Sequence, residues 1–162
     1  MAILTEKEHI EKINAYELHH WQPLFDLIPE IEAQKDFGQA VAPEINPENA
    51  GKDNAPRFFA MPYFIENPVV DKFRKIAYQI PIIIDFDWTT WRVGEMMFLD
   101  DDFDYDTIDI PTKCKLLTAF VRSDRFNDGY LISVFEKGLV LKVLKSIEKQ
   151  LISKEQNNAG IY

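Results

Sequence analysis

The chain has 162 residues, of which 46% are hydrophobic, and it carries a net charge of −9. That length and composition predict a single globular domain over residues 1–162, and the excess of acidic residues argues against nucleic-acid binding, for which a basic face is usual. The single cysteine, Cys114, excludes an intrachain disulfide and a multi-cysteine zinc site, so we expect a reducing, cytoplasmic setting.

The first predicted element is a helix that begins at Glu6, because Thr5 starts a Thr-x-x-Glu capping box. The segment 21–33 follows as one kinked helix or two short ones, since Pro23 and Pro29 suit the first turn of a helix but not its interior. We see no signal peptide, and no apolar run reaches the about 20 residues that a membrane helix needs. We therefore expect no membrane association.

The helical pattern is lost between residues 37 and 68. Five of the nine prolines fall in this segment, together with the Asn, Gly and Asp residues of NPENAGKDNAP. Such a composition predicts a long proline-rich loop or an insertion, with a short strand near residues 57–61. Loops of this length in compact domains are often functional.

Order returns at Asn67, a helix cap that is followed by a proline at the first helical position. Pro81 is predicted to end this helix. The three isoleucines at 82–84 are β-branched and predict one short strand.

Asp87 is the expected N-cap of the next helix. In that helix Trp88, Trp91 and Phe98 would share one face, and Gly94 would allow a neighbour to approach closely. Packing in the core is our first interpretation of the two tryptophans. A groove for a partner or ligand, lined by the indoles, is the alternative, because tryptophan is favoured at binding hot spots.

The longest predicted helical region begins after Pro111 and breaks at residues 127–129 and again at Gly138. The last helix is expected to end near Ser153, with residues 154–162 as a frayed tail. The chain thus has six or seven predicted helices and at most a few short strands. This count predicts a mainly α, single-domain, helical bundle-like fold.

A charged cluster closes the segment 116–131, LLTAFVRSDRFNDGYL, whose earlier part is apolar. Steps of about 100° per residue place Asp124 on the apolar face of the helix. An unpaired buried carboxylate is costly, so it needs donors, either from Arg122 or Arg125 or from the N–H groups that begin the next helix. We interpret the cluster, which includes Asp128, as a structural junction between two helices.

The same arginines also suit a ligand site, because guanidinium groups bind carboxylate and phosphate. A small anionic-ligand binder or an enzyme is therefore an alternative function. Its candidate ligand-binding residues are Arg122, Arg125, Asp124, Trp88 and Trp91. No catalytic residue can be assigned, because the chain lacks phosphate-loop, nucleophile-elbow and metalloprotease signatures, and we expect no cofactor.

The remaining candidate chemistry is weaker. The acidic loop 100–106 lacks the glycine and glutamate positions of an EF-hand, and we interpret it as a solvated loop and predict no metal site. His19 and His20 are adjacent, so they point in different directions on a helix and are interpreted as surface residues. Cys114 lies on the predicted buried face and is interpreted as an inert thiol.

A DNA-binding module is the third function considered. Two helices separated by Gly138 resemble a helix-turn-helix, and the last of them carries Lys142, Lys145 and Lys149 on its polar side. A DNA-reading helix usually adds Arg, Asn or Gln directed at base edges. These lysines are more typical of a solvated face.

LLTAFVRSDRFNDGYL, together with MPYFI at residues 61–65 and DFDWTTW at residues 85–91, resembles an uncharacterised bacterial family of unknown function with FDW-x-x-W and LLTA-x-VR-x-x-RF motifs. The resemblance covers roughly residues 61–151 and implies no activity. The absence of a catalytic signature, the tryptophan pair and the proline-rich loop together favour a non-enzymatic protein-interaction module, with a protein partner or a homodimer.

Overall fold

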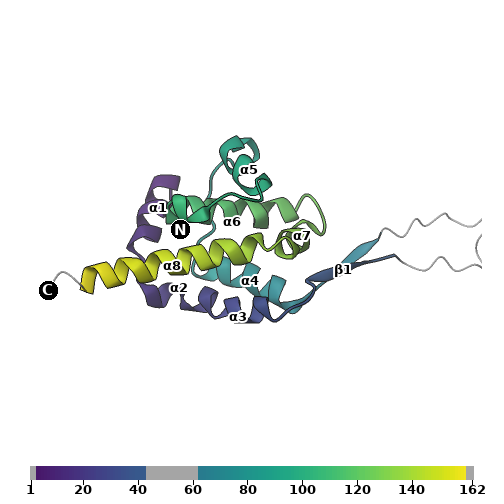
Figure 1. Cartoon of the computed structure of the whole chain (residues 1–162). Helices are drawn as coiled ribbons and strands as arrows, with labels where there is room; N and C mark the ends of the chain where they lie inside the picture. Colours follow the sequence, from purple (N-terminus) through teal and green to yellow (C-terminus); the bar gives the residue numbers. More distant parts are fainter. Residues whose placement is uncertain (1–2, 43–61, 160–162) are drawn as a thin grey trace, which may run out of the picture.

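A computed structural model describes residues 3–42 and 62–159 of the chain. Figure 1 shows a helical body from which one β-hairpin projects. The elements, in chain order, are α1 (Glu6–Ala15), α2 (Leu18–Phe25), α3 (Leu27–Glu32), β1 (Gly38–Val41), β2 (Tyr63–Glu66), α4 (Pro68–Gln79), the 3-10 turn η1 (Trp88–Thr90), α5 (Arg92–Leu99), the 3-10 turn η2 (Tyr105–Thr107), α6 (Ile110–Asp124), α7 (Tyr130–Glu136) and α8 (Leu139–Ala159). The predicted mainly α fold is confirmed.

The central element is α8. It contacts α2, α3, α6 and α7, and Figure 1 shows α2 and α3 on one side of it and α6 on the other. Fully buried core side chains of α6 and α8 are Leu116, Leu117, Phe120, Val140, Val143, Leu144 and Ile147. Burying one such side chain contributes about 1.5–3 kcal/mol, so contacts along these two helices hold the body together. Among the described helices, none is both long and apolar enough to cross a bilayer.

Several helix ends lie where local sequence predicts them. The Thr5 hydroxyl accepts a hydrogen bond from the Glu8 N–H (3.2 Å), and the Glu8 carboxylate accepts one from the Thr5 N–H (2.8 Å). The Asn67 side chain caps α4 by accepting from the Val69 N–H (3.0 Å). Gly129 and Gly138 precede α7 and α8 with positive φ values of 80° and 75°, a conformation that glycine adopts without strain.

Three helix boundaries differ from the prediction. The helix expected after Asp87 begins as η1, and α5 itself begins only at Arg92. α2 begins at Leu18, so Pro23 lies inside the helix and not in its first turn. The earlier start is stabilised by His20, whose Nδ1 accepts a hydrogen bond from the Glu17 N–H (3.1 Å). At the other end of the chain, α8 continues past the predicted end at Ser153 as far as Ala159.

The predicted strand at 82–84 is wrong. These three isoleucines form a buried, irregular segment against α6. The Ile84 N–H donates to the Thr118 hydroxyl (3.0 Å), which in turn donates to the Cys114 carbonyl (2.8 Å). A side chain of α6 thus satisfies a backbone group that a neighbouring strand would otherwise satisfy.

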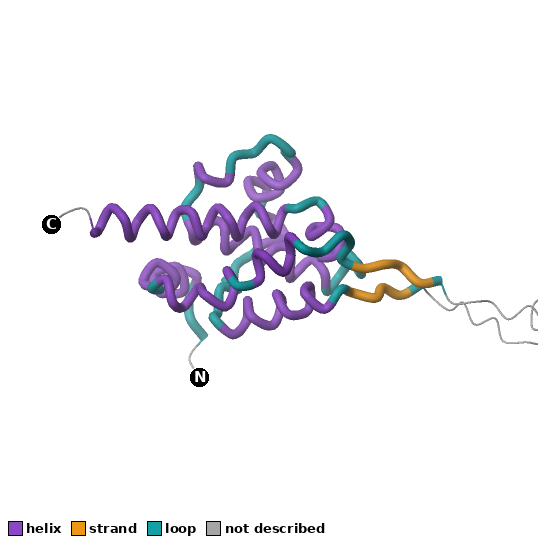
Figure 2. Tube along the Cα trace, turned by 60° about the horizontal axis from the view of Figure 1, so that its bottom comes forward, coloured by secondary structure: helices purple, strands orange, loops and turns teal. Residues whose placement is uncertain are grey.

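The segment predicted as a loop, 37–68, is not a loop at its two ends. β1 and β2 pair there as an antiparallel hairpin, in a register that runs from Gly38 opposite Glu66 to Val41 opposite Tyr63. The hairpin projects from the helices in Figures 1 and 2. The predicted strand near residues 57–61 lies outside the described residues.

Candidate functional site

Asp124 points to the inner side of α6, as predicted, but only one of its two hydrogen-bond donors was predicted. Its Oδ1 accepts from the Leu131 N–H in the first turn of α7 (3.0 Å), which confirms the helix-start donor. Its Oδ2 accepts from Nη2 of Arg74 on α4 (3.0 Å). The prediction that Arg122 or Arg125 neutralises Asp124 is therefore wrong. Local sequence does not reveal Arg74 as the partner, because it lies 50 residues away in the chain.

The Arg74 guanidinium also binds Glu66 of β2 through two hydrogen bonds (2.7 and 3.2 Å) and Asp71 of α4 (3.0 Å). Burial opposes its positive charge, but Glu66 and Asp124 outweigh this effect and the pKa of Arg74 is raised. We call Arg74, Glu66, Asp71 and Asp124 the Arg74 cluster. It joins the hairpin to α4, α6 and α7, and its cation is fully engaged by carboxylates.

Arg122 and Arg125 are placed differently. Both guanidinium carbons lie near the ring of Tyr78 on α4, at 5.9 and 6.0 Å from its centroid. Nη2 of Arg125 also donates to the Tyr78 hydroxyl (3.1 Å). Within the part of the chain that the structure describes, neither guanidinium has a carboxylate within 4.0 Å. Each therefore interacts with an aromatic face instead of an acid.

Two further rings continue this surface. Phe126 follows Arg125 directly, is 81% exposed, and packs against Trp88 with 6.0 Å between ring centroids. We call Tyr78, Trp88, Arg122, Arg125 and Phe126 the arginine–aromatic surface. The sequence alone pointed to both of its arginines and to its tryptophan. Phe126 was not predicted as part of the surface, although its position next to Arg125 at the end of a helix was a usable signal. Tyr78 was not predicted either.

Trp91 is separated from this surface. Its ring packs edge-on against Phe86 (5.3 Å) and covers Gly94, where an added Cβ would lie 2.2 Å from the indole. The predicted close approach at Gly94 is therefore confirmed, and the approaching group is Trp91. Trp88 lies in η1 and Trp91 immediately before α5, so the two indoles do not share one helical face.

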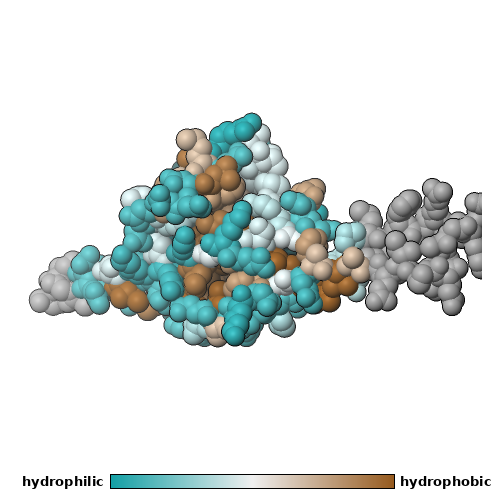
Figure 3. Space-filling view, turned by 45° about the vertical axis from the view of Figure 1, so that its right-hand side comes forward, coloured by the Kyte–Doolittle hydropathy of each residue, from teal (hydrophilic) through white to brown (hydrophobic). Residues whose placement is uncertain are grey.

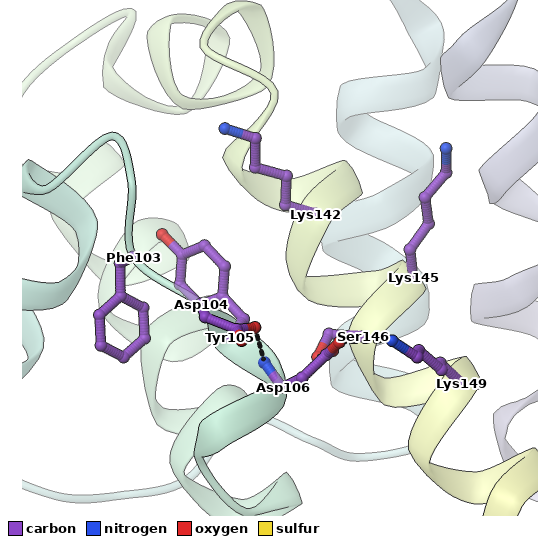
Figure 4. Close-up of a pocket in the computed structure, with 8 residues that line it drawn as sticks. All are labelled: Phe103, Asp104, Tyr105, Asp106, Lys142, Lys145, Ser146 and Lys149. Carbon is purple, nitrogen blue, oxygen red and sulfur yellow. Dashed lines mark hydrogen bonds and ion pairs between the residues drawn. The ribbon is translucent and has the colours of Figure 1, made fainter.

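Neither of two surface hollows contains Arg122 or Arg125. The first, of about 300 Å³, lies between η2 and α8, and Figure 4 shows the residues that line it. The second, of about 220 Å³, lies between the hairpin and α7. Arg125 is exposed and Arg122 is half-buried, and the small-molecule alternative gains no support from these two hollows.

The lysine stripe of α8 is largely neutralised. Nζ of Lys149 lies 2.7 Å from Asp106, and Nζ of Lys145 lies 3.1 Å from Glu32. The bond to Lys149 is the largest contribution to a lowered pKa of Asp106. Two of the three lysines in the stripe therefore form ion pairs with acids of other elements, and both pairs are exposed to solvent.

The remaining candidates are the two adjacent histidines, the cysteine and a metal site. His19 and His20 are exposed at the start of α2, as predicted. Cys114 is buried, and burial raises the pKa of its thiol. In residues 3–42 and 62–159, no group of three His, Cys, Asp or Glu side chains is placed to hold a metal ion.

A family model described as "Family of unknown function (DUF6508)" matches residues 16–153. The chain belongs to this family. The match confirms the resemblance to a family of unknown function and extends it toward the N-terminus, where α2 and α3 lie within the matched range. The whole arginine–aromatic surface also lies within the family region. Searches of curated proteins and of solved structures each found no match.

Proposed function

We propose that this family member is a protein-interaction module without catalytic activity, and that its arginine–aromatic surface binds a protein segment with carboxylates beside apolar side chains. One observation carries the proposal. In a chain with 27 acidic and 18 basic side chains, Arg122 and Arg125 lie together on one aromatic ring without a carboxylate within 4.0 Å among the described residues.

The electrostatics of this arrangement favour an acidic partner. Two neighbouring guanidinium groups repel each other, and an incoming carboxylate relieves that repulsion while forming charge-assisted hydrogen bonds. Because Tyr78 already orders both arginine side chains, less conformational entropy is lost when a partner binds.

The composition of the surface favours a protein partner. Arginine, tryptophan and tyrosine are enriched at binding hot spots, and the exposed Phe126 ring beside Trp88 offers apolar contact area. The surface lies outside both hollows, which suits an extended protein segment better than a small molecule that must be largely enclosed.

The test is selection from a displayed random-peptide library on the immobilised full chain. We expect enrichment of peptides that combine Asp or Glu with aromatic or aliphatic residues, and at least tenfold weaker binding of those peptides to an Arg122→Ala/Arg125→Ala variant. Lys7→Ala/Lys12→Ala is the matched control, because it makes the same change in charge on exposed positions of α1. Equal binding by both variants would overturn the proposal.

A further inference from the structure

A second surface of the molecule, on α5, is also exposed and apolar. Val93, Met96 and Leu99 are 59%, 73% and 66% exposed and recur at every third position. We call these three residues the α5 stripe. The opposite side of α5 packs on α6, where the ring of Phe98 lies 5.6 Å from that of Phe120. Since α5 is apolar on both sides, its outer side has the character of a surface that is covered in an assembly.

Figure 3 shows hydrophobic atoms among hydrophilic ones at the level of α5, and again near the hairpin. In the α5 stripe, three exposed apolar side chains recur along one helix. Single exposed apolar residues, in contrast, are normal on a protein surface. The stripe therefore calls for a specific occupant.

The two ends of α5 carry opposite charges. Arg92 is the first residue, its side chain is 85% exposed, and its nearest acid is Glu95 at 3.6 Å in a solvated pair. Asp100 caps the other end, and it is followed by Asp101 and Asp102, which are both exposed. The N-terminal end of the stripe is thus positively charged and its C-terminal end is negatively charged.

We propose that a second copy of this chain covers the stripe, with the two α5 helices antiparallel across a two-fold axis at Met96. This arrangement places Val93 against the partner's Leu99 and Met96 against the partner's Met96. It also brings Arg92 to the carboxylates at the end of the partner's α5. A two-fold contact requires such a self-complementary surface.

The order of charges selects this occupant. In an antiparallel copy, the carboxylates at the end of α5 lie opposite Arg92 of the first copy. The apolar stripes of the two copies then lie against each other. The inference goes beyond the proposed function because it uses a different surface and a different partner. An eight-residue helix is about 12 Å long, so α5 supplies less area than a stable interface of about 800 Å² per partner needs. The dimer is therefore weak and depends on concentration.

Sedimentation equilibrium of the full chain between about 5 and 500 μM tests the proposal. We expect the wild-type chain to shift from monomer toward dimer as its concentration rises. Met96→Glu places two carboxylates at the axis, and this variant is expected to remain monomeric with an unchanged melting temperature. Ile152→Glu is the matched control, because Ile152 is an exposed apolar residue of α8, and this variant should dimerise like the wild type.

Cross-linking tests the symmetry. Met96→Cys brings two thiols together at the proposed axis, so mild oxidation should yield a covalent dimer on a non-reducing gel. Ile152→Cys should not yield one at the same concentration. The native Cys114 is buried and does not compete.

A charge exchange tests the orientation. Arg92→Asp should weaken dimerisation at least fivefold, and Arg92→Asp/Asp101→Arg should restore it. The Arg122→Ala/Arg125→Ala variant should still dimerise, so this inference and the proposed function can fail separately. A wild-type chain that stays monomeric at every concentration, or a Met96→Glu variant that dimerises equally well, would overturn the inference.

Discussion

A single arginine, Arg74, and a pair of arginines, Arg122 and Arg125, lie around the same helix junction and differ in what surrounds them. The side chain of Arg74 is 24% exposed, and its guanidinium is bound by Glu66, Asp71 and Asp124. The guanidinium groups of the half-buried Arg122 and the exposed Arg125 lie near an aromatic ring, with no carboxylate within 4.0 Å among the described residues. A charge withdrawn from water must be neutralised, whereas a solvated charge need not be. We therefore expect the Arg74 cluster to stabilise the fold, and the function we propose assigns the other two arginines to binding.

The largest expected effect comes from breaking the Arg74 cluster. Arg74→Ala leaves Glu66 and Asp124 without their cation, and we expect a loss of about 2–3 kcal/mol in the free energy of unfolding. We expect a smaller loss of stability than for a fully buried ion pair, because the arginine side chain is 24% exposed to solvent. Urea unfolding followed by circular dichroism measures it. A loss below about 0.5 kcal/mol, as for ordinary surface substitutions, would remove the contrast between Arg74 and the other two arginines.

A second effect concerns the attachment of the hairpin to α7. Gly129 has a φ of 80°, and an added Cβ would lie 2.6 Å from the Phe64 ring. Gly129→Ala should cost about 1–2 kcal/mol through backbone strain and this clash. In a Phe64→Ala background the cost should fall, because the clash is gone and only the strain remains. Equal costs in both backgrounds would show that the ring does not press on this turn.

Arg122 and Arg125 are expected to matter little for stability. Arg122→Ala removes one cation–π contact, and Arg125→Ala removes one together with a hydrogen bond to the Tyr78 hydroxyl. Near the surface we expect each substitution to cost about 0.5–1 kcal/mol. Thermal unfolding of each variant beside Arg74→Ala would measure the difference directly. A loss as large as that of Arg74→Ala would assign these arginines a structural role.

The smallest effect is a pH dependence at α8. Lys149 lowers the pKa of Asp106 in the folded chain. The resulting stabilisation is present above the unfolded-state pKa of aspartate, about 3.9, and is lost as the pH falls through the lower folded value. Lys149→Ala should therefore flatten the decline in stability below about pH 4. An unchanged profile would show that this exposed pair contributes nothing measurable.

Helix ends were predictable where the signal is local. The Thr5 capping box, the Asn67 cap and the breaks at Gly129 and Gly138 each involve residues within a few positions of one another. The same geometry holds in any helix, because the first N–H groups always need acceptors. The mainly α fold could be inferred from these signals together with the helical periodicity, and the inward position of Asp124 could be inferred from steps of about 100° per residue.

Contacts between distant segments were not predictable. The pairing of Asp124 with Arg74 depends on how α4 packs beside α6, and the Ile84–Thr118 hydrogen bond depends on a crossing of separate elements. The two tryptophans make the same point, since only packing places Trp91 over Gly94 and leaves Trp88 beside an exposed ring. Periodicity assigns a side chain to a face of its own helix. Which neighbour that face meets depends on the burial of the whole apolar surface, to which every element contributes.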